Sequence, residues 1–67
     1  MITKSPYYQV GAAVDGRYHV ISWSAPEALR AVIGEGVETL QGVTISMKRL
    51  GVIQARLASA GWHLLAR

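Results

Sequence analysis

The first alternation of apolar and polar residues along the chain predicts a β-hairpin. Two stretches rich in Tyr, Val and Ile, residues 7–14 and 17–23, flank the dipeptide Asp15-Gly16. An Asp-Gly pair supplies the positive φ angles of a type I′ turn, which suits a two-residue hairpin loop. Because side chains alternate between the two faces of a strand, this turn sets four cross-strand pairs on one face. Counted outward from the turn, the pairs are Val14 with Arg17, Ala12 with His19, Val10 with Ile21, and Tyr8 with Trp23.

One face of this hairpin is more apolar than the other, and we expect it to line the core. That face consists of Tyr8, Val10, Ile21 and Trp23. The opposite face carries Tyr7 and Tyr18, and tyrosine is one of the residue types enriched at the energetic centres of protein interfaces. These two tyrosines are therefore candidate partner-binding residues, with an ordinary role in covering the sheet as the alternative.

The segment SAPEALRAVIGEG after the hairpin has the start and stop signals of a helix. Ser24 and Glu27 have the spacing of a capping box, and Pro26 suits the first turn. Gly34 or Gly36 can adopt the left-handed conformation that ends a helix. The apolar face is formed by Leu29, Val32 and Ile33, at positions i, i+3 and i+4. The segment thus predicts a short amphipathic helix.

Two further strands are predicted less directly. Residues 37–42 (VETLQG) fit either a turn of helix or a loop, and residues 43–47 then alternate Val and Ile with Thr and Ser, which predicts a strand. Towards the C-terminal end, Gly61 can close a helix, and residues 62–66 predict a short closing strand. Its inward-facing residues would be Trp62 and Leu64.

Residues 48–61 predict a second helix with two distinct sides. The apolar stripe is formed by Leu50, Ile53 and Leu57, and the opposite side carries Lys48, Arg49 and Arg56. Gly51 lies in the interior of this helix, where glycine costs about 1 kcal/mol relative to alanine. We therefore interpret Gly51 as a site of close packing against the sheet or another helix.

Together these elements predict a small α+β fold in which residues 1–67 form a single domain. A β-hairpin is followed by the order α-β-α-β, which gives a four-stranded sheet with two helices. A chain of this size buries only about 60% of the surface that its unfolded state exposes, so its stability is marginal. Since 51% of the residues are apolar and only 16% are charged, we expect some apolar surface to meet another protein. A homodimer or a larger complex is the plain expectation.

The charge is unevenly distributed along the chain. The net charge is +3. Residues 1–38 carry three basic and four acidic side chains, a net of −1, whereas residues 39–67 carry four basic side chains and no acidic one, a net of +4. This asymmetry indicates an anionic partner for the second half. The start of the chain lacks the apolar run of a signal peptide, and no apolar stretch approaches the roughly 18 residues of a membrane span, so we expect a cytoplasmic protein that does not enter a membrane.

The sequence contains no motif that is typical of a catalytic, metal or cofactor site. The chain has no cysteine, which excludes disulfides and thiolate zinc sites. His19 and His63 lie in predicted strands without further ligands, and two imidazoles alone make a poor zinc site. Glu35 and Glu38 have the spacing of a solvated surface, and the glycines of residues 34–42 match neither the dinucleotide fingerprint nor a P-loop. We therefore expect a non-enzymatic protein that uses no metal and no cofactor.

The basic side of the second helix makes nucleic-acid binding the alternative function. Arginines there can contact phosphates or guanine edges. When the segment is aligned as a helix-turn-helix with Gly42 at the turn, however, Lys48 and Gly51 fall where a buried aliphatic residue is required. Only a winged or otherwise divergent variant fits. An ordinary solvated helix face is the other interpretation of the same residues.

These observations favour a non-enzymatic macromolecule-binding protein. The first hypothesis is a protein–protein interaction module that acts as a dimer or in a complex, as small regulators, adaptors and inhibitors do, including those of phages and mobile elements. The alternative is a small nucleic-acid-binding regulator that uses the basic helix 48–60. The expected partner-binding residues are Tyr7, Tyr18, Lys48, Arg49 and Arg56.

Overall fold

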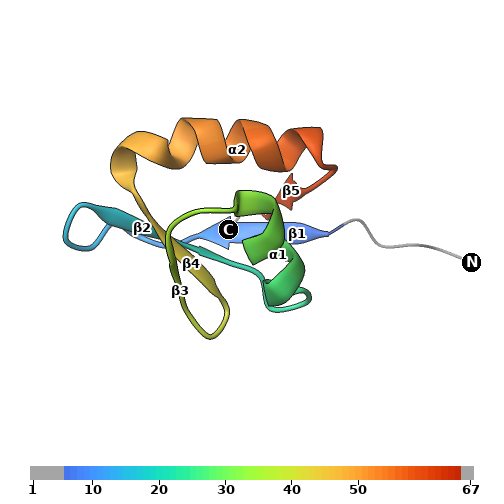
Figure 1. Ribbon diagram of the computed structural model, residues 1–67, viewed down its shortest axis with the longest axis horizontal. Coiled ribbons are helices and arrows are strands. Elements are labelled where there is room, and N and C mark those ends of the chain that lie inside the picture. The colour runs from blue at the N-terminus through green and yellow to red at the C-terminus, as the bar shows by residue number, and fades with distance from the viewer. Residues whose placement is uncertain (1–5, 66–67) are drawn as a thin grey trace, which may run out of the picture.

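The described part of the chain, residues 6–65 of a computed structural model, forms a mixed five-stranded sheet and two helices (Figure 1). The elements in chain order are β1 (Tyr7–Val10), β2 (Arg17–Ile21), α1 (Pro26–Ile33), β3 (Val37–Glu38), β4 (Gly42–Ser46), the 3₁₀ turn η1 (Met47–Arg49), α2 (Leu50–Ser59) and β5 (His63–Leu64). The strand order is β3-β4-β2-β1-β5, with β5 parallel to β1 and the other neighbours antiparallel. The predicted α+β fold is confirmed. The fifth strand is β3, which forms within the segment VETLQG and pairs with β4.

A single core forms between the two helices and one face of the sheet. The helices contribute Leu29, Ile33, Ile53 and Leu57, and the strands contribute Tyr8, Val20, Val43 and Ile45, all of which are buried. Trp62, just before β5, completes the core and is only 6% exposed, as predicted. The apolar stripe of α2 therefore packs as expected, with Ile53 and Leu57 fully buried and Leu50 at its margin.

The hairpin contains a β-bulge that the sequence pattern did not reveal. Val14 is opposite Arg17 beside the Asp-Gly turn, as predicted. Farther from the turn, however, Val10 is opposite Val20. Three residues of the first strand, 11–13, therefore face only two of the second, which is the count that defines a bulge. These residues are Gly-Ala-Ala, whose small side chains provide no apolar pattern to fix the register.

The bulge exchanges the two faces of β2 relative to the prediction. A one-residue shift in register turns every side chain of a strand to the other face. Val20 and Ser22 are consequently buried, and Tyr18 packs against the core rather than lying on the outer face. The prediction that Ile21 and Trp23 line the core was wrong, and Trp23 is 54% exposed.

The predicted start of α1 was also wrong in detail. Ser24 and Glu27 do not form a capping box, because the helix begins at Pro26 and its N-cap residue is Ala25. No side chain in the described part of the chain accepts a capping hydrogen bond at this end. Instead, the hydroxyl of Ser22 accepts a hydrogen bond of 3.2 Å from the backbone N–H of Ala25. The buried serine thus fixes the turn that leads from β2 into the helix.

Two predictions about the last third of the chain were wrong. Gly51 is exposed on α2, and a Cβ atom built there would meet no atom within 4 Å in the part of the chain that the structure describes. It is therefore not a close-packing site. Leu64 was expected to turn inward but is 53% exposed on β5, at the edge of the sheet.

The close approach of two strands instead occurs at Gly42. This residue is buried at the start of β4, opposite Ile21 of β2. A Cβ atom built on Gly42 would overlap the carbonyl oxygen of Val20, which belongs to the backbone of β2 and cannot rotate away. The pairing of β2 with β4 is the longest in the sheet, with five residue pairs, so the absence of a side chain at this position permits the central ladder to form.

We expect Gly42→Ala to destabilise the protein strongly. The added methyl group must push β2 and β4 apart, and overpacking of this kind costs up to about 3 kcal/mol. Domains of this length have a total unfolding free energy of about 3–10 kcal/mol, so much of the stability would be lost. Chemical denaturation followed by circular dichroism measures the change.

The matched control is Gly51→Ala, which adds the same methyl group to the exposed side of α2. Here we expect the unfolding free energy to rise by about 1 kcal/mol, because alanine is the better helix former. The melting temperature should increase by about 4–8 °C. Equal effects of the two alanines, or a stabilised Gly42→Ala variant, would contradict the assignment of Gly42 as the close contact.

Candidate macromolecule-binding surface

Two of the three predicted basic residues are engaged within the protein. The guanidinium of Arg49 donates two hydrogen bonds to the carboxylate of Glu35, at 2.8 and 2.7 Å. Arg56 lies 3.5 Å from the same carboxylate and also donates to the carbonyl oxygen of Ile33. The two arginine side chains remain 43% and 40% exposed. They join the loop between α1 and β3 to η1 and α2, and their charge is partly offset by Glu35.

This ion cluster changes the titration of its members. Hydrogen bonds from Arg49 lower the pKa of Glu35 from its usual value of 4.5, and this effect outweighs the partial desolvation that raises it. The positive charges of Arg49 and Arg56 lower that pKa further. In return, Glu35 raises the pKa of Arg49. The cluster is therefore ionised at neutral pH and dissociates only in acid.

The five predicted partner-binding residues do not share one surface. Lys48 is exposed in η1, and it makes no ion pair with a carboxylate of residues 6–65. Arg49 and Arg56 lie with Glu35 on the helical side of the molecule. Tyr18 belongs to the core side of the sheet, whereas Tyr7 alternates with the buried Tyr8 and lies on the other side. The structure brings the arginines together but separates them from Tyr7.

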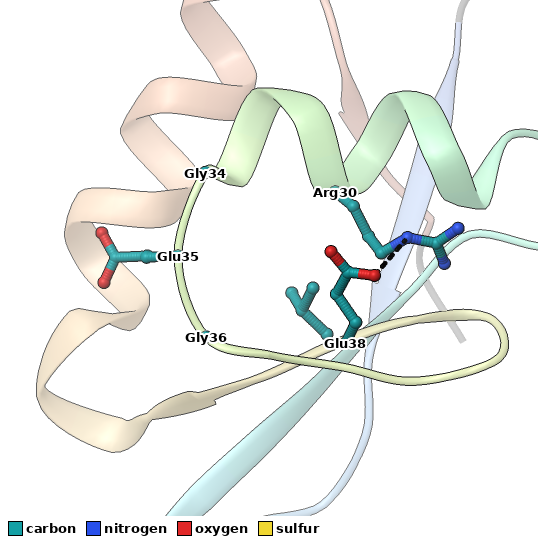
Figure 2. A pocket seen from close by; sticks show the side chains of 6 residues that line it. Arg30, Gly34, Glu35, Gly36 and Glu38 are labelled. Atoms are coloured by element: carbon teal, nitrogen blue, oxygen red, sulfur yellow. Dashed lines mark ion pairs between the residues drawn. The ribbon is translucent and has the colours of Figure 1, made fainter.

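A small pocket of about 240 Å³ lies where α1, the following loop and the strands β3 and β4 meet. It is lined by Arg30, Gly34, Glu35, Gly36, Glu38 and Val43. Figure 2 shows that Arg30 and Glu38 meet there, with Nε and Oε1 3.7 Å apart, while the side chain of Glu35 points away from the pocket. Arg30 also donates to the carbonyl oxygen of Thr39 at 3.1 Å. Its charged groups are thus already paired with each other, which leaves little for a ligand to bind.

The second face of the sheet is the larger candidate surface, because neither helix packs on it in the described part of the chain. Its side chains alternate with the buried ones along each strand. The neighbouring pairs on this face are Tyr7 with His63, Gln9 with Ile21, Ile21 with Gly42, His19 with Thr44, Arg17 with Ser46, and Val37 with Thr44. Except for the buried Gly42, these residues are partly or fully exposed. We call this surface the open face.

Aromatic side chains gather at one end of the open face. Tyr7 of β1 is next to His63 of β5. At the same end of the sheet, β2 ends at Ile21, opposite Gln9. Trp23 follows two residues later, in the bend that leads to α1, and its indole is more than half exposed and is not part of the core. We call Tyr7, His63 and Trp23 the aromatic row.

A fixed cation lies farther along the same face. The Nε of Arg17 donates to the hydroxyl of Thr44 at 3.2 Å, and its Nη2 donates to the carbonyl oxygen of Thr44 at 2.6 Å. The guanidinium thus reaches across to β4, beside His19, whose Nε2 lies 2.6 Å from the hydroxyl of Thr39. A guanidinium has five N–H donors, so three remain for a ligand.

None of the four acidic side chains lies on the open face, and all four are within residues 6–65. Asp15 is in the hairpin turn, Glu27 in the first turn of α1, Glu35 against Arg49, and Glu38 beside Arg30. The face therefore combines aromatic rings with positive charge and contains no carboxylate side chain. This separation is not visible in the linear sequence, where acids and bases alternate through the first half.

Sequence reasoning identified Tyr7 but missed Arg17 and Trp23. Both were assigned to the core side of the hairpin because the bulge was not recognised. The signal that was available is the alternation of Tyr18, Val20 and Ser22, which leaves the intervening residues on the opposite face. The short Gly-Ala-Ala segment was the place where an extra residue could be accommodated.

Comparisons with known proteins add no relatives: the chain matches no protein-family model, no curated protein and no solved structure. Within residues 6–65, neither helix has the length and apolar character needed to cross a bilayer. The same residues contain no group of three or more His, Asp or Glu side chains placed to hold a metal ion. The geometry of the open face is therefore the basis for assigning a function.

The Glu35 cluster predicts a loss of stability in acid. Its carboxylate has a lower pKa in the folded state than in the unfolded state. Its contribution to stability is therefore complete above about pH 4.5 and is lost as the pH falls through the folded-state pKa. Between about pH 5 and pH 3, the unfolding free energy of Glu35→Gln should fall less steeply than that of the wild type.

Urea denaturation at a series of pH values measures this difference. The control is Glu27→Gln, which removes an exposed carboxylate that no basic side chain contacts in the described part of the chain. This variant should keep the wild-type pH profile. The proposed role of the cluster is wrong if Glu35→Gln follows the wild-type profile as well.

Proposed function

We propose that this protein is a non-enzymatic binding module that docks on another macromolecule through the open face of its sheet. The observation that carries this proposal is the exposed Trp23, which follows β2 at the end of the sheet where Tyr7 lies. Tryptophan is on average highly buried in folded proteins, yet this one is 54% exposed although the core accommodates the second tryptophan of the chain. An exposed indole at the end of a central strand is well suited to become buried on binding.

The composition of the open face supports the same proposal. Tyrosine, tryptophan and arginine are the residue types most enriched among side chains that dominate binding energy. Tyr7 and Arg17 lie on the open face, and Trp23 is exposed just beyond the end of β2. Antiparallel sheets commonly pack one face against the core and expose the other face to water, and the exposed face is then polar. Here Ile21 lies between the aromatic row and the cation, which gives the face an apolar centre.

Arg49 of η1 and Arg56 of α2 support a different role from the one first expected. Arg49 and Arg56 are held by Glu35, so a partner that recruited them would first have to disrupt a hydrogen-bonded ion cluster. Lys48 remains available at the end of β4, next to Ser46. We therefore place the binding surface on the sheet and assign the arginines to holding the helical layer together.

The test compares Trp23→Ala with Val52→Ala. Val52 is also a large exposed apolar residue, but it lies on α2, away from the open face. Crosslinking in cells that produce the protein would identify bound molecules by mass spectrometry for proteins and by sequencing for nucleic acids. We expect the wild type and Val52→Ala to recover the same partner, and Trp23→Ala to reduce recovery by about 30-fold, the effect of a hot spot of about 2 kcal/mol.

Circular dichroism and thermal melting of both variants serve as the folding control, because neither residue is part of the core. The proposal is contradicted if Trp23→Ala recovers the partner as well as the wild type does. A partner that is lost on substitution of Lys48 but retained by Trp23→Ala would move the binding surface to the helical side.

A further inference from the structure

We propose that the molecule bound by the open face is a single-stranded nucleic acid. Its bases would stack on the aromatic row of Tyr7 and Trp23, and its phosphates would reach Arg17. This inference rests on the proposed function, since it names the class of partner for the same surface.

The size of the open face favours an extended ligand over a globular protein. Five strands about 4.8 Å apart span about 20 Å, and the five residues of the longest strands extend about 17 Å. The flat outline of the strands is therefore about 350 Å², and the accessible surface of its side chains is somewhat larger. A stable protein–protein interface usually buries about 800 Å² of accessible surface on each partner, so a globular partner would also have to contact residues outside the sheet. A flat strip of this size suits a polymer chain that lies across it.

The aromatic row provides a platform for unpaired bases. Side chains on neighbouring strands of one face lie about 5 Å apart, so Tyr7 lies against His63. The exposed Trp23 follows β2 at the same end of the sheet. Aromatic side chains stack with every base because each base has a π-face, which is the common mode of single-strand binding. Bases that are paired within a duplex offer no free face, so the row favours single strands.

The cation lies at a suitable separation from this row. The guanidinium of Arg17 is held beside His19, which is two residues, or about 7 Å, before the end of β2 at Ile21. Trp23 follows in the bend beyond Ile21, so about two nucleotides at the stacked spacing of about 3.4 Å fit between the cation and the end of the strand. Thr44 fixes the guanidinium through two hydrogen bonds, and its three remaining N–H groups can contact phosphate oxygens.

Charge complementarity favours an anionic ligand over a second copy of the same protein. All four carboxylate side chains lie off the open face, whereas Arg17, His19 and His63 lie on it. A second copy of this protein would bring a like-charged face against it. A nucleic acid instead exchanges counterions of its phosphates for the guanidinium of Arg17, and its bases cover the exposed indole of Trp23.

Fluorescence anisotropy with labelled 15-nucleotide oligo(dT) and oligo(U) tests this inference, at 50 and 200 mM salt. We expect binding to both, weaker binding to a 15-base-pair duplex, and an affinity that falls as salt rises. Tyr7→Ala and Trp23→Ala should each weaken binding by about 5- to 150-fold, the range for loss of one stacked base. The matched control Val52→Ala should bind like the wild type.

Two further variants separate stacking from charge. Arg17→Gln should reduce the slope of the logarithm of affinity against the logarithm of salt concentration by about 0.7, the value for one phosphate contact on a single strand. Bound oligonucleotide should quench the exposed Trp23, and the quenching should disappear in Trp23→Phe, where only the buried Trp62 remains. Heparin serves as a polyanion without bases, and its binding should not respond to Tyr7→Ala.

The inference is overturned if no oligonucleotide binds at 50 mM salt, if duplex binds more tightly than single strands, or if heparin binding shows the same dependence on Tyr7 and Trp23. Self-association or a protein complex that Trp23→Ala disrupts, without oligonucleotide binding, would refute the nucleic acid while the proposed binding function stands. If Trp23→Ala changes no interaction of any kind, both proposals fail.

Discussion

The structure depends on the fact that two helices cover one face of a five-stranded sheet. Leu29 and Ile33 of α1 and Ile53 and Leu57 of α2 meet the strands on one side only. Residues 6–65 supply no further helix for the other side. The core is therefore one layer deep, and the second face of the sheet must be compatible with water, with a partner, or with both. Its mixture of aromatic, aliphatic and cationic side chains follows from that dual requirement.

The distribution of charge in space differs from its distribution along the chain. The second half is basic and the first half is slightly acidic, which suggested a basic helix facing an anionic partner. In the fold, Glu35 from the first half contacts Arg49 and Arg56 from the second. These opposite charges therefore join the two halves of the chain. The cation on the open face is Arg17, from the half that the sequence shows as acidic.

Periodicity predicted the elements that have a strong local pattern, and these were found. The amphipathic helices, the strand at residues 43–46 and the buried Trp62 follow from apolar spacing and end signals. The open face was predicted only at Tyr7, because the rest depends on register. A bulge adds one residue without changing composition, and the two-residue strand β3 is too short to show alternation. The bulge and β3 both depend on long-range strand pairing, which no local sequence pattern reports.

The bulge at residues 11–13 has a consequence for how this chain can vary. The length of this segment, rather than the identity of its small side chains, decides which of the alternate side chains of β2 are buried. Deletion of a single residue there would remove the bulge and shift the register of β2 by one residue. Trp23 would then face the core in place of Ser22. Divergent versions of this sequence should therefore tolerate substitutions in the Gly-Ala-Ala segment far more readily than insertions or deletions.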